Sequence, residues 1–307
     1  MLPPKIICFA NAKGGVGKTK ASVALLDCLV GSHGRNALLI DTDQQASASL
    51  FMLEGDFAAR KRLEDRRKTI DHYFEALMFG ATIPFGHLIS SKVRMFAGVP
   101  TSTPAFGSLV AASERIDFVE ERIISTGHEP PLASGGWLTK YNTIFGKLCP
   151  VFKADIIDSC SKTAHEFIII DTAAGIRLFS VAAMIIADLI IVPTVPDLAS
   201  LNATARFIAQ MHKYETVVGG YLPNMHLLFT KVQPGFRSHD DSISTLLSFG
   251  PSPRAHDILE AQFLQRDIIA QIDNSPMPLQ TFEHKYDLAT GNVKEITREI
   301  LALLGHG

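Results

Sequence analysis

The chain has few of the residues that define several common protein classes. It contains 4 cysteines among 307 residues, and none of them forms a CxxC pair, so neither a disulfide framework nor a zinc site is indicated. Cys8 and Cys28 lie within apolar patterns, and we expect both to be small core residues. The N-terminus lacks the charged region, apolar run and cleavage site that are typical of a signal peptide.

Long apolar runs and an excess of basic charge are also missing. The most apolar stretch, LFSVAAMIIADLIIVPTV, is interrupted by Asp188 and Pro193, which favours a buried helix and strand over a membrane span. The net charge is −2, so composition does not indicate a nucleic-acid-binding protein, although a local basic patch would be enough for one. We therefore expect a cytoplasmic protein.

Apolar runs that alternate with helical patterns predict an α/β fold, with a doubly wound, mostly parallel sheet flanked by helices. Uninterrupted runs of Ile, Leu and Val are typical of strands buried on both faces, and intervening helices imply crossover connections. The predicted strands lie at residues 5–10, 36–43, 165–175, 188–196 and 225–232, and residues 92–102 are expected to add a strand and a turn. We expect residues 1–307 to form a single domain with an irregular insertion at about 119–164.

The segment KGGVGKT joins the first predicted strand to a predicted helix. Glycines let the backbone wrap around phosphate groups, and the amides of the loop then face the anion together with the helix N-terminus. The pattern GxxxxGK[ST] is matched only approximately, and it places Lys18 at the terminal phosphates and the Thr19 hydroxyl on Mg²⁺. The predicted nucleotide-binding residues are Lys13, Gly14, Gly15, Val16, Gly17, Lys18, Thr19 and Lys20. A chance Gly-Lys-Thr in a loop is the alternative interpretation.

Acidic residues follow two of the predicted strands, where ligands bind in sheets of this kind. Asp171 comes after FIII, in the position of a carboxylate that holds Mg²⁺ through water. Asp41 and Asp43 alternate at the end of another strand, so one can order a magnesium-bound water and the other can orient the attacking water. Asp171 could instead cap the helix that follows it, and Asp43 or Ser47 could cap the helix after the other strand.

Together these motifs resemble the ParA/MinD family of deviant Walker A P-loop ATPases. KGGVGKT, LLIDTDQQAS and FIIIDTAAG stand in the order and spacing of that family, and ADLIIVPTVPDLASL and LLFTKVQP extend the likeness. The resemblance implies a P-loop NTPase fold that binds ATP and Mg²⁺. It also implies an ATP-dependent homodimer and a slow basal ATPase rate that a partner protein raises.

The resemblance also implies roles for individual residues. Lys13 matches a lysine that reaches across the dimer to the partner's phosphates, where a second cation stabilises the transferring group. Lys18 takes the usual phosphate-binding role, and Asp43 matches the residue needed for hydrolysis, so these three are the catalytic candidates. The candidate magnesium-side residues are Thr19, Asp41 and Asp171.

The sequence departs from the family pattern at several positions beside these motifs. Lys20 stands where Thr or Ser is usual, and Gln44 stands where Pro is common. Ala173 and Ala174 also replace prolines that are common in relatives. None of these changes removes a reacting group, so we still expect activity.

The likeness is greatest to ParA-type partition and positioning ATPases. Such a protein would bind DNA non-specifically as an ATP dimer and would move plasmid, chromosome or protein cargo over the nucleoid. Its partner would be a ParB-like protein or a cargo adaptor. Contacts of this kind rest on basic side chains, although a scattered solvated surface is the alternative for each candidate. The candidate DNA-binding residues are Lys213, Lys231, Arg237, Arg254 and Arg266.

Other functions stay open. A MinD-like membrane ATPase would use an amphipathic tail, but we expect the apolar face of the tail here to pack on the domain. That face consists of Val293, Ile296, Ile300, Leu303 and Leu304. A nucleotide-switched scaffold without significant hydrolysis is a further alternative. An iron–sulfur reductase is disfavoured because Cys149 and Cys160 lack a suitable context.

Overall fold

The protein is described here by a computed structural model. It covers residues 3–91, 105–126, 136–217, 222–233, 235–248, 258–264, 282–286 and 289–306. The predicted strand and turn at 92–102 lie outside the described residues.

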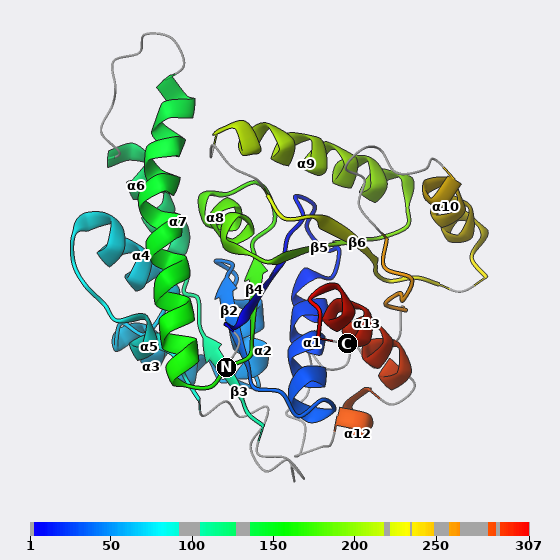
Figure 1. Cartoon of the computed structure of the whole chain (residues 1–307), viewed down its shortest axis with the longest axis horizontal. Coiled ribbons are helices and arrows are strands. Elements are labelled where there is room, and N and C mark those ends of the chain that lie inside the picture. The colour runs from blue at the N-terminus through cyan, green and yellow to red at the C-terminus, as the bar shows by residue number, and fades with distance from the viewer. Residues whose placement is uncertain are drawn as a thin grey trace.

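Six parallel strands form one sheet in the order β3-β2-β4-β1-β5-β6 (Figure 1). The strands are β1 (Lys5–Phe9), β2 (Ala37–Thr42), β3 (Gly107–Val110), β4 (Phe167–Thr172), β5 (Leu189–Thr194) and β6 (Met225–Phe229). The predicted fold class is therefore confirmed, and five strands lie where the apolar runs predicted them. Strand β3 was not predicted, because its four residues, GSLV, are too short to form a distinct apolar run.

Helices cover both faces of the sheet. They are α1 (Lys18–Gly31), α2 (Ser47–Met52), α3 (Phe57–Asp65), α4 (Ile70–Phe79), α5 (Phe85–Leu88), α6 (Ile116–Thr126), α7 (Gly136–Lys162), α8 (Leu178–Ile186), α9 (Leu198–Val217), α10 (Arg237–Ser248), α12 (Phe282–Tyr286) and α13 (Thr290–Leu303). Because all six strands run in one direction, their carboxyl ends meet at one edge, where binding sites form in such sheets.

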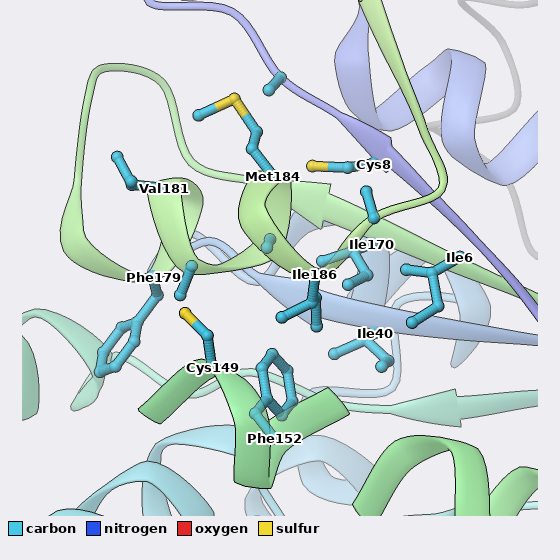
Figure 2. Packing of buried hydrophobic residues seen from close by; sticks show 14 of the residues in the cluster. Ile6, Cys8, Ile40, Cys149, Phe152, Ile170, Phe179, Val181, Met184 and Ile186 are labelled. Carbon is cyan, nitrogen blue, oxygen red and sulfur yellow. The ribbon is translucent and has the colours of Figure 1, made fainter. Parts of the chain in front are cut away.

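Side chains alternate between two apolar cores along each strand. Ile6 and Cys8 of β1 face a core built with α4 to α9, and Figure 2 shows them beside Met184 and Ile186 of α8. Ile7 and Phe9 of the same strand face a second core built with α1, α12 and α13. Burial on both faces explains why the strands read as continuous apolar runs.

The segment expected to be an irregular insertion is largely helical, so that prediction was wrong for the residues the structure describes. Helix α6 covers Ile116–Thr126, and α7 runs from Gly136 to Lys162 with Pro150 inside it. Buried side chains recur along α7 at helical spacing, including Phe145, Phe152 and Ile156, and pack into the first core. The Gly, Pro and Ser residues before α7 had hidden this periodicity.

The C-terminal helix α13 packs against α1, as Figure 1 shows. Val293, Ile296 and Ile300 are buried, which confirms the packing predicted for the apolar face. Leu303 is 43% exposed and departs from that prediction. Within the described ranges, no helix combines the length and the apolar character needed to cross a membrane.

A buried ion pair joins α12 to the middle of α1. The Lys285 ammonium lies 3.2 Å from one carboxylate oxygen of Asp27 and 3.3 Å from the other. Burial raises the pKa of Asp27, and the positive charge of Lys285 opposes that rise. The pair therefore fixes where the C-terminal helices dock on the helix that follows the glycine loop.

We predict that Lys285→Ala lowers the free energy of unfolding by about 3 kcal/mol, because it removes the opposite charge beside the buried carboxylate of Asp27. Urea unfolding followed by circular dichroism measures the change. Lys294→Ala is the matched control, since it breaks a more exposed pair with Glu283 and should cost less than about 1 kcal/mol. Equal losses in the two variants would contradict the prediction.

Candidate functional site

The glycine loop lies between the end of β1 and the start of α1, at the carboxyl edge of the sheet. Gly15 has φ 74° and Gly17 has φ 85°, which is backbone that favours glycine over other residues. Gly17 is also the N-cap of α1 and provides no side-chain cap. The first amides of α1 therefore lack a capping side chain and can bind an anion.

Neighbouring strands anchor the loop. The Thr230 hydroxyl, just after β6, donates a 2.7 Å hydrogen bond to the Val16 carbonyl. The side-chain NH₂ group of Asn11 donates a 2.8 Å hydrogen bond to the Pro193 carbonyl, and the side-chain oxygen of Asn11 accepts a 3.1 Å hydrogen bond from the backbone amide of Lys13. Sequence reasoning missed Asn11 and Thr230. Their only sequence signal was their position, each directly after an apolar run.

Lys18 lies beneath the loop and is buried. Its ammonium donates a 3.3 Å hydrogen bond to the carbonyl of Lys13. Burial lowers the pKa of Lys18, while the negative charges of Asp171 and Asp43 oppose this. The ammonium thus lies near the two carboxylates that the sequence had placed in the same site.

Asp41 and Asp171 occupy paired positions of the adjacent strands β2 and β4. Burial raises the pKa of Asp171 to about 8, and repulsion from Asp41 adds to the rise, while Thr19 and Lys18 oppose it. Both carboxylate oxygens of Asp171 are buried without a hydrogen-bond partner of standard geometry in the described part of the chain. An oxygen pair of this kind fits a hydrated cation, with the Thr19 hydroxyl as its neighbour.

The carboxylate of Asp41 is bound by its own chain. One oxygen accepts hydrogen bonds from the amide and hydroxyl of Ser49, at 2.8 and 2.7 Å, and the other accepts from the Asp43 amide at 3.0 Å. Burial raises the pKa of Asp41 to about 6, and these hydrogen bonds oppose the rise. Asp41 therefore orients the segment that carries Asp43, and its predicted contact with magnesium stays a prediction.

Asp43 lies after the end of β2, beside a tight turn. One of its carboxylate oxygens accepts a 3.0 Å hydrogen bond from the Gln45 amide, a contact typical of aspartate in turns. The other oxygen is left for further contacts. This contact supports the turn before α2 but does not cap the helix, whose N-cap is Ala46 and makes no side-chain capping hydrogen bond. The capping alternative for Asp43 is therefore wrong, and its catalytic role stays a prediction.

Lys13 turns toward the start of α9 in its own chain. Its ammonium donates a 2.6 Å hydrogen bond to the Ser200 hydroxyl and lies 3.7 Å from the Asp197 carboxylate. Asp197 in turn accepts hydrogen bonds from the amide and hydroxyl of Ser200. Asp197 and Ser200 had been part of the motif quoted from the sequence, but no role had been assigned to either.

The candidate DNA-binding residues are only partly within the described structure. Lys231 and Arg237 are exposed and lie between the end of β6 and the start of α10. Lys213 belongs to α9. Arg254 and Arg266 lie outside the described residues.

Comparison with known proteins identifies the family to which the chain belongs. A family model described as the CobQ/CobB/MinD/ParA nucleotide binding domain matches residues 7–273, and the chain belongs to that family. An uncharacterized protein of Mycobacterium tuberculosis is 26% identical over 236 residues, which are 76% of this chain. The match spans 59% of that relative's length.

Solved structures share the fold at low sequence identity. McdA from Cyanothece has a TM-score of 0.68 and 17% identity, covering 97% of this chain and 99% of its own. Cobyrinic acid a,c-diamide synthase from Mycobacterium smegmatis, with an ATP analogue and magnesium bound, has a TM-score of 0.61 and 14% identity, covering 98% and 96%. A plasmid partition protein from Borrelia burgdorferi has a TM-score of 0.55 and 18% identity, covering 97% and 100%.

We predict that Thr230→Val loosens the glycine loop, because it removes the hydroxyl that donates to the Val16 carbonyl. The free energy of unfolding should fall by about 1 kcal/mol, and binding of ATP should weaken by about tenfold. Thermal unfolding and isothermal titration calorimetry measure these effects. Thr230→Ser keeps the hydroxyl and should bind ATP as the wild type does; equal weakening in both variants would contradict a role for the hydrogen bond.

Proposed function

We propose that this member of the CobQ/CobB/MinD/ParA family is an ATPase that dimerises with ATP and binds DNA without sequence preference. The observation that carries the proposal is the placement of a buried lysine and three acidic residues at the carboxyl edge that also bears the glycine loop. Lys18 donates to the Lys13 carbonyl of that loop. Asp171 is paired with Asp41, which binds the Asp43 amide. Basic and acidic groups placed around backbone amides are what phosphoryl transfer requires, since its catalysis is mainly positioning and charge stabilisation.

The glycine loop would bind the phosphates through its amides and the N-terminus of α1. Lys18 is already held against the loop and would transfer its hydrogen bond from the Lys13 carbonyl to a phosphate oxygen. Asp43 has one carboxylate oxygen outside its turn contact and would orient the attacking water. Asp41 would support that geometry by binding the Asp43 amide.

Mg²⁺ would be held by Thr19 and Asp171, and Asp41 remains a further candidate. The Asp171 oxygens support this assignment, since they are buried without a hydrogen bond of standard geometry among the described residues. When bound, the cation would offset negative charge on the phosphates. The cation would also offset the repulsion between Asp41 and Asp171. Without it, the charge of Lys18 and the hydroxyl of Thr19 oppose the effect of that repulsion on Asp171.

Lys13 would act in trans within an ATP dimer. In the single chain its ammonium contacts Ser200 and Asp197, and the side chain is 35% exposed. A surface ion pair of this kind is weak, so the lysine can leave it for a stronger contact with a partner's phosphates. Hydrolysis would then depend on dimerisation, because the second cation arrives only with the second chain.

The cellular role that fits these features is the partition or positioning of plasmid, chromosome or protein cargo. A ParB-like protein or cargo adaptor would raise a slow basal rate, and the protein would be cytoplasmic and associated with the nucleoid. Lys231 and Arg237, exposed at the carboxyl edge of β6, are the described candidates for contacts with DNA phosphates.

Two other functions remain as alternatives with specific expectations. A membrane ATPase would use the tail helix, but the buried Val293, Ile296 and Ile300 face α1 and the second core. A scaffold without hydrolysis would bind ATP and dimerise while releasing no phosphate even in the presence of its partner.

We predict that Lys13→Ala binds ATP with an affinity close to that of the wild type but stays monomeric. Phosphate release should fall by about 100-fold or more, because the cation supplied in trans is lost. Light scattering with ATP reports the mass, and Lys18→Ala is the comparison that should lose ATP binding itself. A Lys13→Ala protein that still dimerises with ATP would refute the role in trans.

Asp43→Ala should accumulate the ATP dimer, because nothing orients the attacking water. We predict that this variant retards plasmid DNA on a gel with ATP and not with ADP, and that added salt weakens the retention. Lys231→Glu combined with Arg237→Glu should reduce it, whereas Arg66→Glu, at the exposed end of α3, should not. No retention by a protein that dimerises would shift the proposal to the membrane or scaffold alternative.

A further inference from the structure

Helix α6 lies against the start of α8, which follows the loop after Asp171. Its apolar side chains Ile116, Val119 and Ile123 are buried in the first core and hold the helix in place. Its acidic side chains Asp117 and Glu120 contact the residues where α8 begins. An element outside the motifs therefore contacts the chain only a few residues from the candidate site.

Three interactions connect the two helices. The Arg177 guanidinium lies 2.6 Å from an Asp117 carboxylate oxygen, and its Nε donates a 3.4 Å hydrogen bond to Glu120. The other carboxylate oxygen of Glu120 accepts a 2.9 Å hydrogen bond from the backbone amide of Leu178. We call Asp117, Glu120 and Arg177 the α6 clamp.

Glu120 supplies a cap that the local sequence of α8 lacks. The N-cap residue of α8 is Arg177, whose side chain makes no capping hydrogen bond. The Glu120 carboxylate instead satisfies the first amide of the helix and brings negative charge to its positive end. The Glu120 side chain is only 10% exposed, so the contact is shielded from solvent, and loss of the carboxylate would leave the buried Leu178 amide without an acceptor.

The clamp holds one end of a loop that lies beside the glycine loop. At the other end, Asp171 is held in β4. Between them, the Ala174 side chain lies 3.9 Å from where a Cβ on Gly14 would be, and Gly175 turns the chain with φ 99°. Alanines at 173 and 174 restrict the backbone less than prolines would, so contacts at the two ends determine where this loop lies.

We propose that Asp117, Glu120 and Arg177 are positioning residues for the ATP hydrolysis proposed above. They hold residues 173–176 against the glycine loop, so that Asp171 and the phosphate-binding backbone keep their relative placement. The inference rests on the proposed function, because the geometry it preserves matters only if ATP is hydrolysed there. Small displacements of reacting groups are enough to slow such a step.

The test separates turnover from binding. Arg177→Ala and Asp117→Ala should each lower kcat for phosphate release by about tenfold, while the affinity for ATP stays within about twofold of the wild type. Arg177→Lys keeps the positive charge and should recover part of the loss. A variant that combines Arg177→Ala with Asp117→Ala should be no slower than Arg177→Ala alone, because both changes break the same ion pair. Glu121→Gln is the matched control, since Glu121 is an exposed carboxylate of the same helix and should leave kcat unchanged.

Hydrogen exchange tests the clamp without requiring turnover. In Arg177→Ala and Glu120→Ala, amides of residues 173–178 should exchange faster than in the wild type, with Leu178 affected most. If the wild type releases no phosphate, the proposed function fails, and unchanged exchange would separately overturn the clamp. Faster exchange with unchanged kcat in an active enzyme would overturn the positioning role, because the loop would then move without consequence for hydrolysis.

Discussion

Two aspartates face each other across paired positions of β2 and β4, inside the protein. Burial away from water is unfavourable for a carboxylate and raises the pKa of Asp171, and the like charge of Asp41 adds to this rise. The surrounding structure offsets this cost unequally. Asp41 receives hydrogen bonds from Ser49 and from the Asp43 amide, whereas Asp171 receives none of standard geometry within the described ranges. That inequality separates Asp41, which orients the segment with Asp43, from Asp171, which we propose as a magnesium-side residue.

The same hydrogen bonds tie the site to the rest of the fold. The Ser49 hydroxyl that donates to Asp41 also accepts from the Ala112 amide, just after β3. The chain then enters α6, whose Glu120 caps the helix that follows Asp171. The segments after β2, β3 and β4 are therefore connected by contacts at the carboxyl edge. A change in any one of them has a physical route to the candidate catalytic groups.

Placement of the glycine loop depends on strands far away in the sequence. Thr230, after β6, binds the Val16 carbonyl, and Asn11 binds the Pro193 carbonyl at the end of β5. Lys13 contacts the start of α9 through Ser200. In the single chain, then, the loop is supported mainly from the β5 and β6 side, while the carboxylates come from the β2 and β4 side. The proposed phosphate site lies between these two groups.

The order of strands and motifs was determined by the sequence itself, because buried parallel strands require long apolar runs and a phosphate loop requires glycines at fixed spacing. Five strands, the helix after the loop and the acidic residues at strand ends could all be predicted in this way. Strand β3 and helix α7 could not, since the first is too short and the second follows a stretch rich in Gly, Pro and Ser. Only the tertiary structure decided which carboxylate is satisfied, where Lys13 points and what Glu120 caps. Those outcomes depend on contacts between residues up to 187 positions apart, and a local pattern carries no information about such contacts.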